Sequence, residues 1–339
     1  MGLPVFVAMI LGAVIALPFL PARASELPII DVHAHLHAGG NAGSLGGSAD
    51  SALAVMDKFG ITKALIMPPP QTVSQGHDET LESYNGYDNA AGRFAFLGGG
   101  GSLNVMIQEA LRSGGVNEEL QGRFRARAEN ILRSGAIGFG EMTAEHVSRR
   151  SGHPYVSAPP DHPLFLLLAD IAAANDVPID LHMEALPDDL PRPEKLSSDN
   201  PNTLRANIAA FGRLLSHNPK AKIIWAHAGW DNTGERTPDL MRELLAAHTN
   251  LYMSLKVAGG TIKDSRPVKE GKKLKRQWKK LIEDFPNRFM IGSDLKYRKG
   301  AKTRGGGPKV YRAILKRLSA EVADKVAYRN AERVFKISH

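Results

Sequence analysis

The sequence contains no cysteine. This absence excludes disulfide bonds, thiolate metal ligands, a cysteine nucleophile and an N-terminal lipid-modified cysteine. Aromatic residues make up only 6% of the 339 residues, which does not suggest a surface for stacking nucleic-acid bases. No G-x-G-x-x-G turn follows the first predicted strand, so the usual dinucleotide-binding signature is also missing.

One long apolar stretch stands at the start of the chain, MGLPVFVAMILGAVIALPFLPARAS. It ends in Ala22-Arg23-Ala24, the small-x-small pattern of a cleavage site. We predict a signal peptide over residues 1–24, cleaved after Ala24, and a mature domain over residues 25–339. An uncleaved membrane anchor is the alternative that this length permits, but the prolines within the stretch disfavour it. The protein is therefore expected to be periplasmic or secreted, without a stable membrane anchor.

The net charge of +8 conceals an asymmetry. Residues 256–336 hold 24 Lys and Arg against 8 Asp and Glu, whereas the remainder holds 19 against 27. A basic C-terminal part is compatible with an anionic substrate or an acidic surface. Much of this charge lies in KEGKKLKRQWKKLIEDF, where apolar residues recur at helical spacing, so a solvated helix face is the better interpretation. No recognisable nucleic-acid motif accompanies the charge, and no nucleic-acid partner is expected.

Short apolar runs alternate with longer helical patterns along the rest of the chain. The predicted strands are PIIDVHA, KALIMP, RFAFLGG, GAIGFGEM, VPIDLHM, AKIIWAHAG, NLYMSLK and RFMIGSD. The predicted helices cover roughly residues 49–60, 80–92, 118–134, 162–176, 203–217, 237–248, 270–285 and 308–336. Pro163, Pro238 and Pro308 agree with three of these starts, because proline is best tolerated in the first turn of a helix.

Eight strand–helix units in one domain predict an α/β fold, a (β/α)₈ TIM barrel. An open doubly wound sheet is the alternative, but the sequence lacks its glycine-rich turn. In a barrel, long loops gather at the carboxyl ends of the strands, where substrates bind. We therefore expect residues 68–80, 98–117, 143–161 and 184–201 to form loops around the catalytic mouth.

Histidines stand at alternate positions in IIDVHAHLH, residues 29–37. Residues i and i+2 of a strand point to the same side, so His33 and His35 would face the barrel interior together. Imidazole is a common neutral ligand of zinc. A strand with histidines on a solvent-facing side is the alternative, but PIIDV is too apolar for an exposed strand.

Four further strands also end in residues able to bind a metal ion. They are Glu141 in GAIGFGEM, His182 in VPIDLHM, His227 in AKIIWAHAG and Asp294 in RFMIGSD. Taken singly, each histidine could be a hydrogen-bonded core residue, and Asp294 could cap a helix. Taken together at strand ends, where barrel enzymes place catalysis, they indicate a site for a divalent metal ion such as Zn²⁺.

The motifs DVHAH, GEM, LHME, WAHAG and MIGSD resemble, in this order, the metal-site strands of the amidohydrolase superfamily. QWKKLIEDFPNRFMIGSD and the terminal NAERVF are similar to its amidohydrolase-related branch. The resemblance covers nearly the whole mature chain. It implies that His33 and His35 hold the more buried metal ion with Asp294, and that His182 and His227 hold a second.

Many members of that superfamily bridge two metal ions with a carboxylated lysine on the fourth strand, and this sequence has no lysine there. Glu141 resembles the bridging glutamate of other members, such as TatD-like nucleases. One or two metal ions per chain are both compatible with this pattern. Asp294, beside the metal-activated water, is the expected general base, and His227 would orient or protonate the substrate if only one ion binds.

Lys256, at the end of MSLK, is the predicted contact of an anionic substrate. His37 and Arg298 are further candidate substrate contacts, and Lys296 shares the prediction made for Arg298. Glu184 is a candidate partner for a metal-bound imidazole.

Among the other polar residues, Asp31 is expected to bond backbone rather than metal. The loop histidines carry no distinguishing signal; they are His77, His146, His153 and His162.

The leading hypothesis is a metal-dependent hydrolase of an ester, lactone, amide or phosphoester bond in a small, possibly anionic substrate. A single-metal, non-oxidative decarboxylase of aromatic or enoic acids, which the resemblance also allows, is the second. A non-catalytic envelope protein with a relict barrel is the third, and the apparently intact ligand set disfavours it. The sequence predicts no particular oligomeric state.

Overall fold

A computed structural model describes most of the chain. The described residues are Gly2 and residues 27–37, 46–73, 92–258, 262, 265–269, 273–298 and 307–339. The predicted signal peptide, apart from Gly2, therefore lies outside the described residues. Within the described part of the chain, no helix is both long and apolar enough to cross a membrane.

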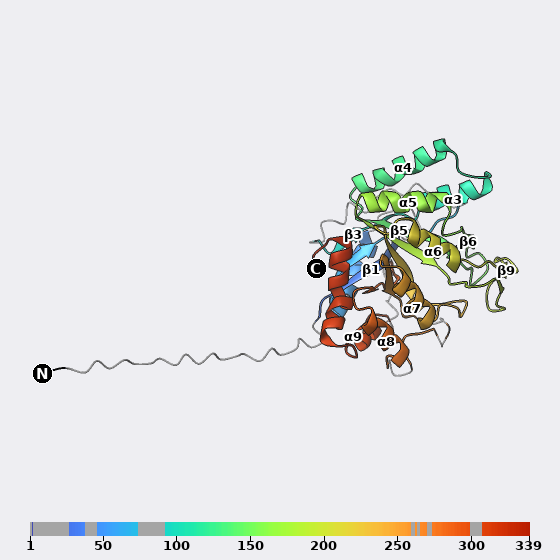
Figure 1. Cartoon of the computed structure of the whole chain (residues 1–339). Coiled ribbons are helices and arrows are strands. Elements are labelled where there is room, and N and C mark those ends of the chain that lie inside the picture. Colours follow the sequence, from blue (N-terminus) through green and yellow to red (C-terminus); the bar gives the residue numbers. More distant parts are fainter. Residues whose placement is uncertain are drawn as a thin grey trace.

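Parallel strands form a barrel with helices around it (Figure 1). Its strands are β1 (Ile29–His37), β2 (Ile61–Ile66), β3 (Phe94–Phe96), β4 (Gly98–Gly99), β5 (Phe139–His146), β7 (Pro178–Met183), β10 (Lys222–Ala228), β11 (Leu251–Leu255) and β12 (Phe289–Ile291). They follow the order β3-β2-β1-β12-β11-β10-β7-β5-β4. Only Leu97 separates β3 from β4, so these two act as one bent strand and the ring closes. The predicted TIM barrel is confirmed.

Shorter strands extend the loops at the carboxyl ends of the barrel strands. β6 (Val156–Ser157) pairs antiparallel with the end of β5, and β13 (Leu295–Arg298) runs parallel to the end of β1. β8 (Leu190–Pro191) and β9 (Thr203–Leu204) form a separate antiparallel ribbon. The predicted mouth loops at 143–161 and 184–201 therefore contain strand pairings, and β5 continues past its expected end.

The helices lie outside the barrel. They are α1 (Gly46–Phe59), α3 (Leu103–Arg112), α4 (Glu118–Arg133), α5 (Pro163–Ala174), α6 (Ile208–His217), α7 (Pro238–Ala247), α8 (Arg276–Asp284), α9 (Gly307–Leu315), α10 (Ala320–Asp324), the π-helical turn η3 (Lys325–Arg329) and α11 (Asn330–Phe335). Pro163 and Pro238 each stand in the first turn of a helix, as predicted.

The prediction of an open loop over residues 98–117 is wrong, because α3 occupies its centre. Leu103, Ile107 and Ala110 recur at helical spacing and are fully buried. The run of glycines at 98–101 hides this signal, since glycine is unfavourable in a helix. Less of the segment between β4 and β5 is therefore loop than predicted, because α3 forms part of it.

Three predicted helices are too long, and the one predicted over 270–285 begins only at Arg276. The helix predicted over 203–217 begins at Ile208, because residues 203–204 form β9 instead. The helix predicted over 308–336 stops at Leu315 and restarts at α10, where the Ser319 side chain accepts a hydrogen bond from the Val322 backbone N–H. Serine is a preferred residue at such a start. The helix predicted over 80–92 lies outside the described residues, except for Gly92.

The strand register shifts where β1, β5 and β10 approach their carboxyl ends. On β1, Ile30 and Val32 belong to an apolar cluster inside the barrel, whereas Ala34 belongs to the core outside it. The inward and outward alternation therefore reverses after Val32, and His33 and His35 face the interior. Bulges of this kind re-aim side chains next to active sites.

Apolar side chains fill the barrel at the end opposite to His33 and His35. Residues from the strands meet the last helix there, in a cluster that contains Ile30, Val32, Leu65, Met67, Leu97, Ile224, Tyr252, Met290, Ala331, Val334 and Phe335. α11 supplies Ala331, Val334 and Phe335 to this cluster and closes the barrel at this end. The larger core lies between the strands and the outer helices.

Candidate metal centre

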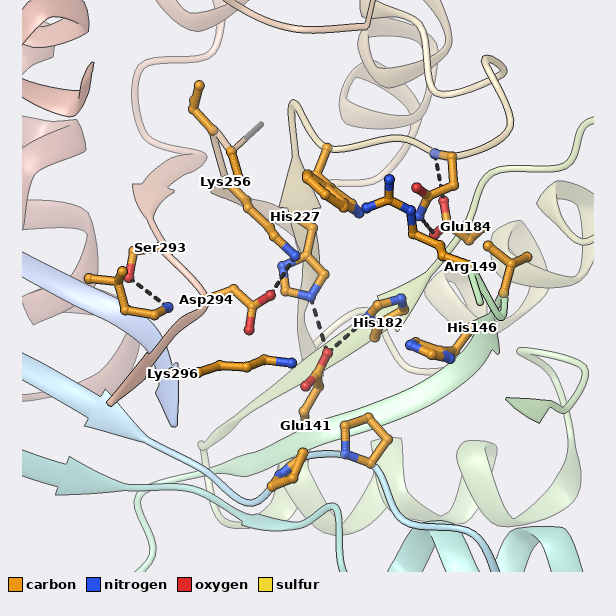
Figure 2. A pocket seen from close by; sticks show the side chains of 18 of the residues that line it. Glu141, His146, Arg149, His182, Glu184, His227, Lys256, Ser293, Asp294 and Lys296 are labelled. Atoms are coloured by element: carbon orange, nitrogen blue, oxygen red, sulfur yellow. Dashed lines mark hydrogen bonds and ion pairs between the residues drawn. The ribbon is translucent and has the colours of Figure 1, made fainter. Parts of the chain in front are cut away.

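Glu141 of β5 lies at the centre of a group of buried imidazoles (Figure 2). Its Oε1 atom is 2.7 Å from His182 Nδ1 and 3.1 Å from His227 Nε2. Its Oε2 atom is 3.4 Å from His35 Nε2 and 3.6 Å from His33 Nε2. One carboxylate therefore faces two histidine pairs, which come from three other strands.

Two groups of three residues have donor atoms within 4.8 Å of one another. One consists of His33, His35 and Glu141, and the other of Glu141, His182 and His227. All five residues are buried, and Glu141 belongs to both groups. The sequence prediction that these side chains come together is therefore consistent with the structure.

The donor set fits a divalent metal ion. The Nε2 atom of His33 is buried and has no hydrogen-bond partner among the described residues. An unsatisfied buried nitrogen costs about 1–3 kcal/mol, which a bound cation would relieve. Burial and the charge of Lys256 hold the pKa of His227 well below its usual range, so this imidazole stays neutral, the form that binds metal.

His227 and Asp294 both have a backbone conformation that non-glycine residues rarely adopt. Their φ angles are +68° and +52°, in the left-handed region. This backbone conformation costs on the order of 1 kcal/mol of folding free energy per residue, and residues that adopt it cluster at functional sites. Each stands where the chain leaves a barrel strand, β10 for His227 and β12 for Asp294.

Asp294 lies beside the metal-binding groups rather than within them. Its Oδ1 atom is 3.0 Å from His35 Nε2, and its Oδ2 atom is 2.5 Å from Lys256 Nζ. Burial alone would raise the pKa of this carboxyl, but Lys256 and the hydrogen bond from His35 hold it well below its usual range. Asp294 is therefore ionised, as a general base must be.

Two buried aspartates support the histidines of β1. Asp180 of β7 places Oδ1 3.0 Å from His33 Nδ1 and is fully buried. Asp31 accepts hydrogen bonds from both the backbone N–H and the hydroxyl of Ser293, and burial raises its pKa to about 6. The expectation that Asp31 bonds backbone is confirmed, and the additional Ser293 hydroxyl ties β1 to the segment before Asp294.

Asp180 was missed by the sequence analysis. Its only signal is its position two residues before His182, which puts it on the same side of the strand. An aspartate that contacts a metal-binding imidazole on its other nitrogen fixes the ring orientation. Glu184, which was expected in that role, instead accepts hydrogen bonds from the Asn232 side chain at 2.6 Å and from its backbone N–H at 3.3 Å.

A cavity of about 710 Å³ opens above this centre. Glu141, His182, His227 and Asp294 reach it, together with the cations of Arg149, Lys256, Arg266 and Lys296. Figure 2 shows Lys256, Lys296 and Asp294 pointing into the same space. Lys256 follows β11, Asp294 follows β12 and Lys296 lies in β13. The cavity is therefore lined by charged groups of both signs around the candidate metal centre.

The residues predicted to contact substrate have different positions. Lys256 lines the cavity, but its ammonium is paired with Asp294 and lies 4.4 Å from the centroid of the Trp230 ring. Arg298 is exposed and is not among the residues that line the cavity. The side chain of His37 lies outside the described part of the chain.

Two loop histidines with no signal in the sequence also line the cavity, His146 and His153. His146 Nδ1 lies 3.0 Å from the carbonyl oxygen of Pro154, which can only accept, so Nδ1 carries the proton. The His146 ring lies 5.0 Å from that of His182, and burial with this neighbour lowers its pKa to about 3. His162 instead caps α5, and His77 lies outside the described residues.

The fold matches solved structures. A probable 2-pyrone-4,6-dicarboxylic acid hydrolase from Acinetobacter baumannii, with citric acid bound, aligns with a TM-score of 0.53 at 11% identity, over 91% of this chain and 99% of that one. A protein from Staphylococcus aureus described as an amidohydrolase aligns with a TM-score of 0.50 at 14% identity, over 92% and 100%. At these identities the likeness concerns the fold.

Sequence comparison supplies the family. The search among curated proteins finds no match. The Amidohydro_2 model, described as amidohydrolase, matches residues 123–337, which include Glu141, His182, His227 and Asp294. This span is more than half of the chain. The chain therefore belongs to the amidohydrolase family.

Proposed function

We propose that the protein is a metal-dependent hydrolase that cleaves an ester, lactone, amide or phosphoester bond of a small substrate. The observation that carries this proposal is the position of Glu141, whose two carboxylate oxygens face separate histidine pairs. A carboxylate placed in this way suits two metal ions that share it. A decarboxylase that uses one metal ion has no need of such a bridge.

His33, His35 and Glu141 would hold one ion, and Glu141, His182 and His227 the other. Imidazole and carboxylate donors suit Zn²⁺, and manganese, iron or cobalt share this preference. A bound divalent ion supplies a water of lowered pKa, near ~7, and polarises the oxygen of the bond to be cleaved.

Asp294 accepts the proton of the attacking water in this proposal. Lys256 keeps its carboxylate ionised and holds its Oδ2 atom in place. After attack, the same carboxyl returns the proton to the leaving group, so no net charge accumulates on the protein. Lys256 thus has an indirect role, because its ammonium compensates the charge of the base.

The basic groups of the cavity favour an anionic substrate. Arg266 and Lys296 line it together with Lys256, and each bound metal ion would add positive charge. The probable 2-pyrone-4,6-dicarboxylic acid hydrolase with the similar fold is named for a hydrolytic reaction, with which the proposal agrees.

Metal content of the purified protein tests the proposal most directly. After mild replenishment, elemental mass spectrometry should find two equivalents of metal per chain, and Glu141→Gln should lower both metal content and hydrolysis. One equivalent in the unchanged protein, with turnover of aromatic acids to carbon dioxide, would favour the decarboxylase. A Glu141→Gln variant with full metal and full hydrolytic activity would remove the basis for a bridge.

The proposal includes export of the chain. The apolar stretch before Ser25 and the Ala22-Arg23-Ala24 pattern support cleavage after Ala24 and a periplasmic or secreted protein. Expression of the full sequence in a bacterium should yield a periplasmic product whose mass is that of a chain beginning at Ser25. A cytoplasmic product of full mass would contradict it.

A further inference from the structure

A second, smaller cavity of about 380 Å³ adjoins the metal-centre cavity. Arg149, His153 and Asn232 line both cavities, so the two share a wall. The smaller one adds Arg150, Lys195 and Leu196. We call it the basic lobe. Neither Arg150 nor Lys195 lines the metal-centre cavity, and neither lies in a sequence motif.

Three loops line the basic lobe, and the one after β10 supplies Asn232. Hydrogen bonds join the other two, which follow β5 and β7. Ser148 donates its backbone N–H to Asn200 Oδ1, and Asn200 Nδ2 donates to the Ser148 carbonyl, both at 2.7 Å. Ser197 N–H also donates to the Ser148 carbonyl at 3.1 Å. Asn200 and Ser148 are both buried. This pairing holds Arg149 and Arg150 of one loop beside the segment that carries Lys195.

An apolar cluster lies beneath the same loops. It consists of Val147, Leu186, Leu196 and Leu204, and each of these side chains is at most 6% exposed. In the sequence, Val147 lies two residues before Arg149, and Leu196 directly follows Lys195. The basic groups therefore stand on loops with their own small core, which reduces the ordering entropy lost when a ligand binds.

The lobe is positively charged on its described lining. Arg149, Arg150 and Lys195 are the ionisable side chains there besides His153, and no carboxylate lines it among the described residues. Burial first, and then the charges of Lys296 and Arg150, lower the pKa of His153. Glu184 lines the main cavity near the shared wall, and its carboxylate accepts hydrogen bonds from Asn232. The lobe can therefore stabilise an anion that enters from the main cavity.

We propose that the basic lobe binds a second anionic group of the substrate, a carboxylate or a phosphate, separated by a spacer from the bond that reacts at Glu141. The inference rests on the proposed function, because it places the reacting bond at the metal centre. Arg150 and Lys195 then determine specificity without contact with the reacting atoms. A guanidinium can bind either anion through two parallel hydrogen bonds.

Calorimetric titration of the metal-loaded protein with unreactive probes tests this proposal. The probes are glutarate, heptanedioate and nonanedioate, the matched monocarboxylate heptanoate, and 6-phosphonohexanoate. At least one dianionic probe should bind about tenfold or more tightly than heptanoate, since a charge-assisted contact is worth at least 1.4 kcal/mol. The preferred spacer gives the separation of the two sites, and the preferred head group distinguishes carboxylate from phosphate.

The double variant Arg150→Gln, Lys195→Gln should lose this advantage and leave the affinity for heptanoate unchanged. Its matched control is Lys309→Gln on α9 with Lys316→Gln directly after it, which removes the same charge from exposed positions that line neither cavity. Equal affinities for all probes, or an advantage that survives in the Arg150 and Lys195 variant, would overturn the proposal. Tight dianion binding without metal-dependent hydrolysis of any ester, lactone, amide or phosphoester would support the basic lobe and count against the hydrolase.

Discussion

The two ends of the barrel are built from the same strands and have opposite characters. At the end closed by α11, strand residues such as Ile30, Ile224 and Met290 pack with Phe335 in a dry cluster. At the other end, β10 presents His227 and the segment after β12 presents Asp294 to a charged cavity, and His33 of β1 packs against the His227 ring. The separation lets one end supply stability while the other collects groups that are costly to bury.

The site end carries features that no stability argument requires. Register shifts in β1, β5 and β10 coincide with His33, Glu141 and His227. Both His227 and Asp294 have a left-handed backbone conformation. Substitutions at the site end should therefore affect metal content or turnover, and those at the other end should affect unfolding.

Asp294→Asn should have the largest effect. The amide cannot accept a proton, so kcat should fall about 10³-fold, near 4 kcal/mol in the barrier. Metal content should stay the same, because neither three-residue ligand group includes Asp294. Steady-state kinetics and elemental mass spectrometry measure both, with the exposed Asp188→Asn as control. Loss of a metal equivalent together with activity would make Asp294 a ligand, as the family resemblance implies.

Phe335→Ala should show the opposite pattern. This ring is 4% exposed and closes the end of the barrel remote from the metal centre. Its removal leaves a cavity in a close-packed cluster, so the free energy of unfolding should fall by about 3 kcal/mol. Urea denaturation measures this, and Leu111→Ala, at a side chain 41% exposed, should cost less than about 1 kcal/mol. A Phe335→Ala protein that loses metal while its stability is unchanged would contradict the separation of the two ends.

The barrel and the convergence of the five buried histidine and glutamate residues at one site could be predicted from the sequence for a simple reason. Each barrel strand is an apolar run, and His182 and His227 close their runs, where a TIM barrel gathers its catalytic groups. The parallel strands bring these ends together whatever the details of the loops. Glu141 came with them, although β5 continues to His146 rather than stopping beside it.

The remainder depends on features that local patterns do not encode. Simple alternation would place Val32 and His33 on opposite sides of β1. Both side chains face the barrel interior because the register shifts after Asp31. The pairing of Lys256 with Asp294 joins residues 38 positions apart. Arg150 and Lys195 come together through the Ser148–Asn200 contact, which no periodicity indicates.

Asp180→Asn should have an intermediate effect, confined to the site end. Asp180 touches His33 through the nitrogen that does not face Glu141, so the change should disturb the orientation of that ring. Metal affinity should fall about 10- to 100-fold. Competition with a chelator of known affinity measures it. An unchanged affinity with a lower free energy of unfolding would mean that Asp180 supports the barrel and not the metal centre.

Glu145→Gln should have the smallest effect on turnover, and its effect on stability should depend on pH. Burial raises the pKa of Glu145 from 4.5 to about 7, despite hydrogen bonds with Ser157 and Tyr155. The folded protein therefore binds this proton more tightly than the unfolded chain, and stability falls as pH rises from 4.5 to 7. The glutamine variant cannot ionise, so the difference in the free energy of unfolding between the two proteins should change by about 3 kcal/mol from pH 4 to pH 8, in favour of the variant at pH 8. Urea denaturation of both proteins across this range measures the difference. A pH-independent difference would place the ionisable group responsible for any such stability change elsewhere in the barrel.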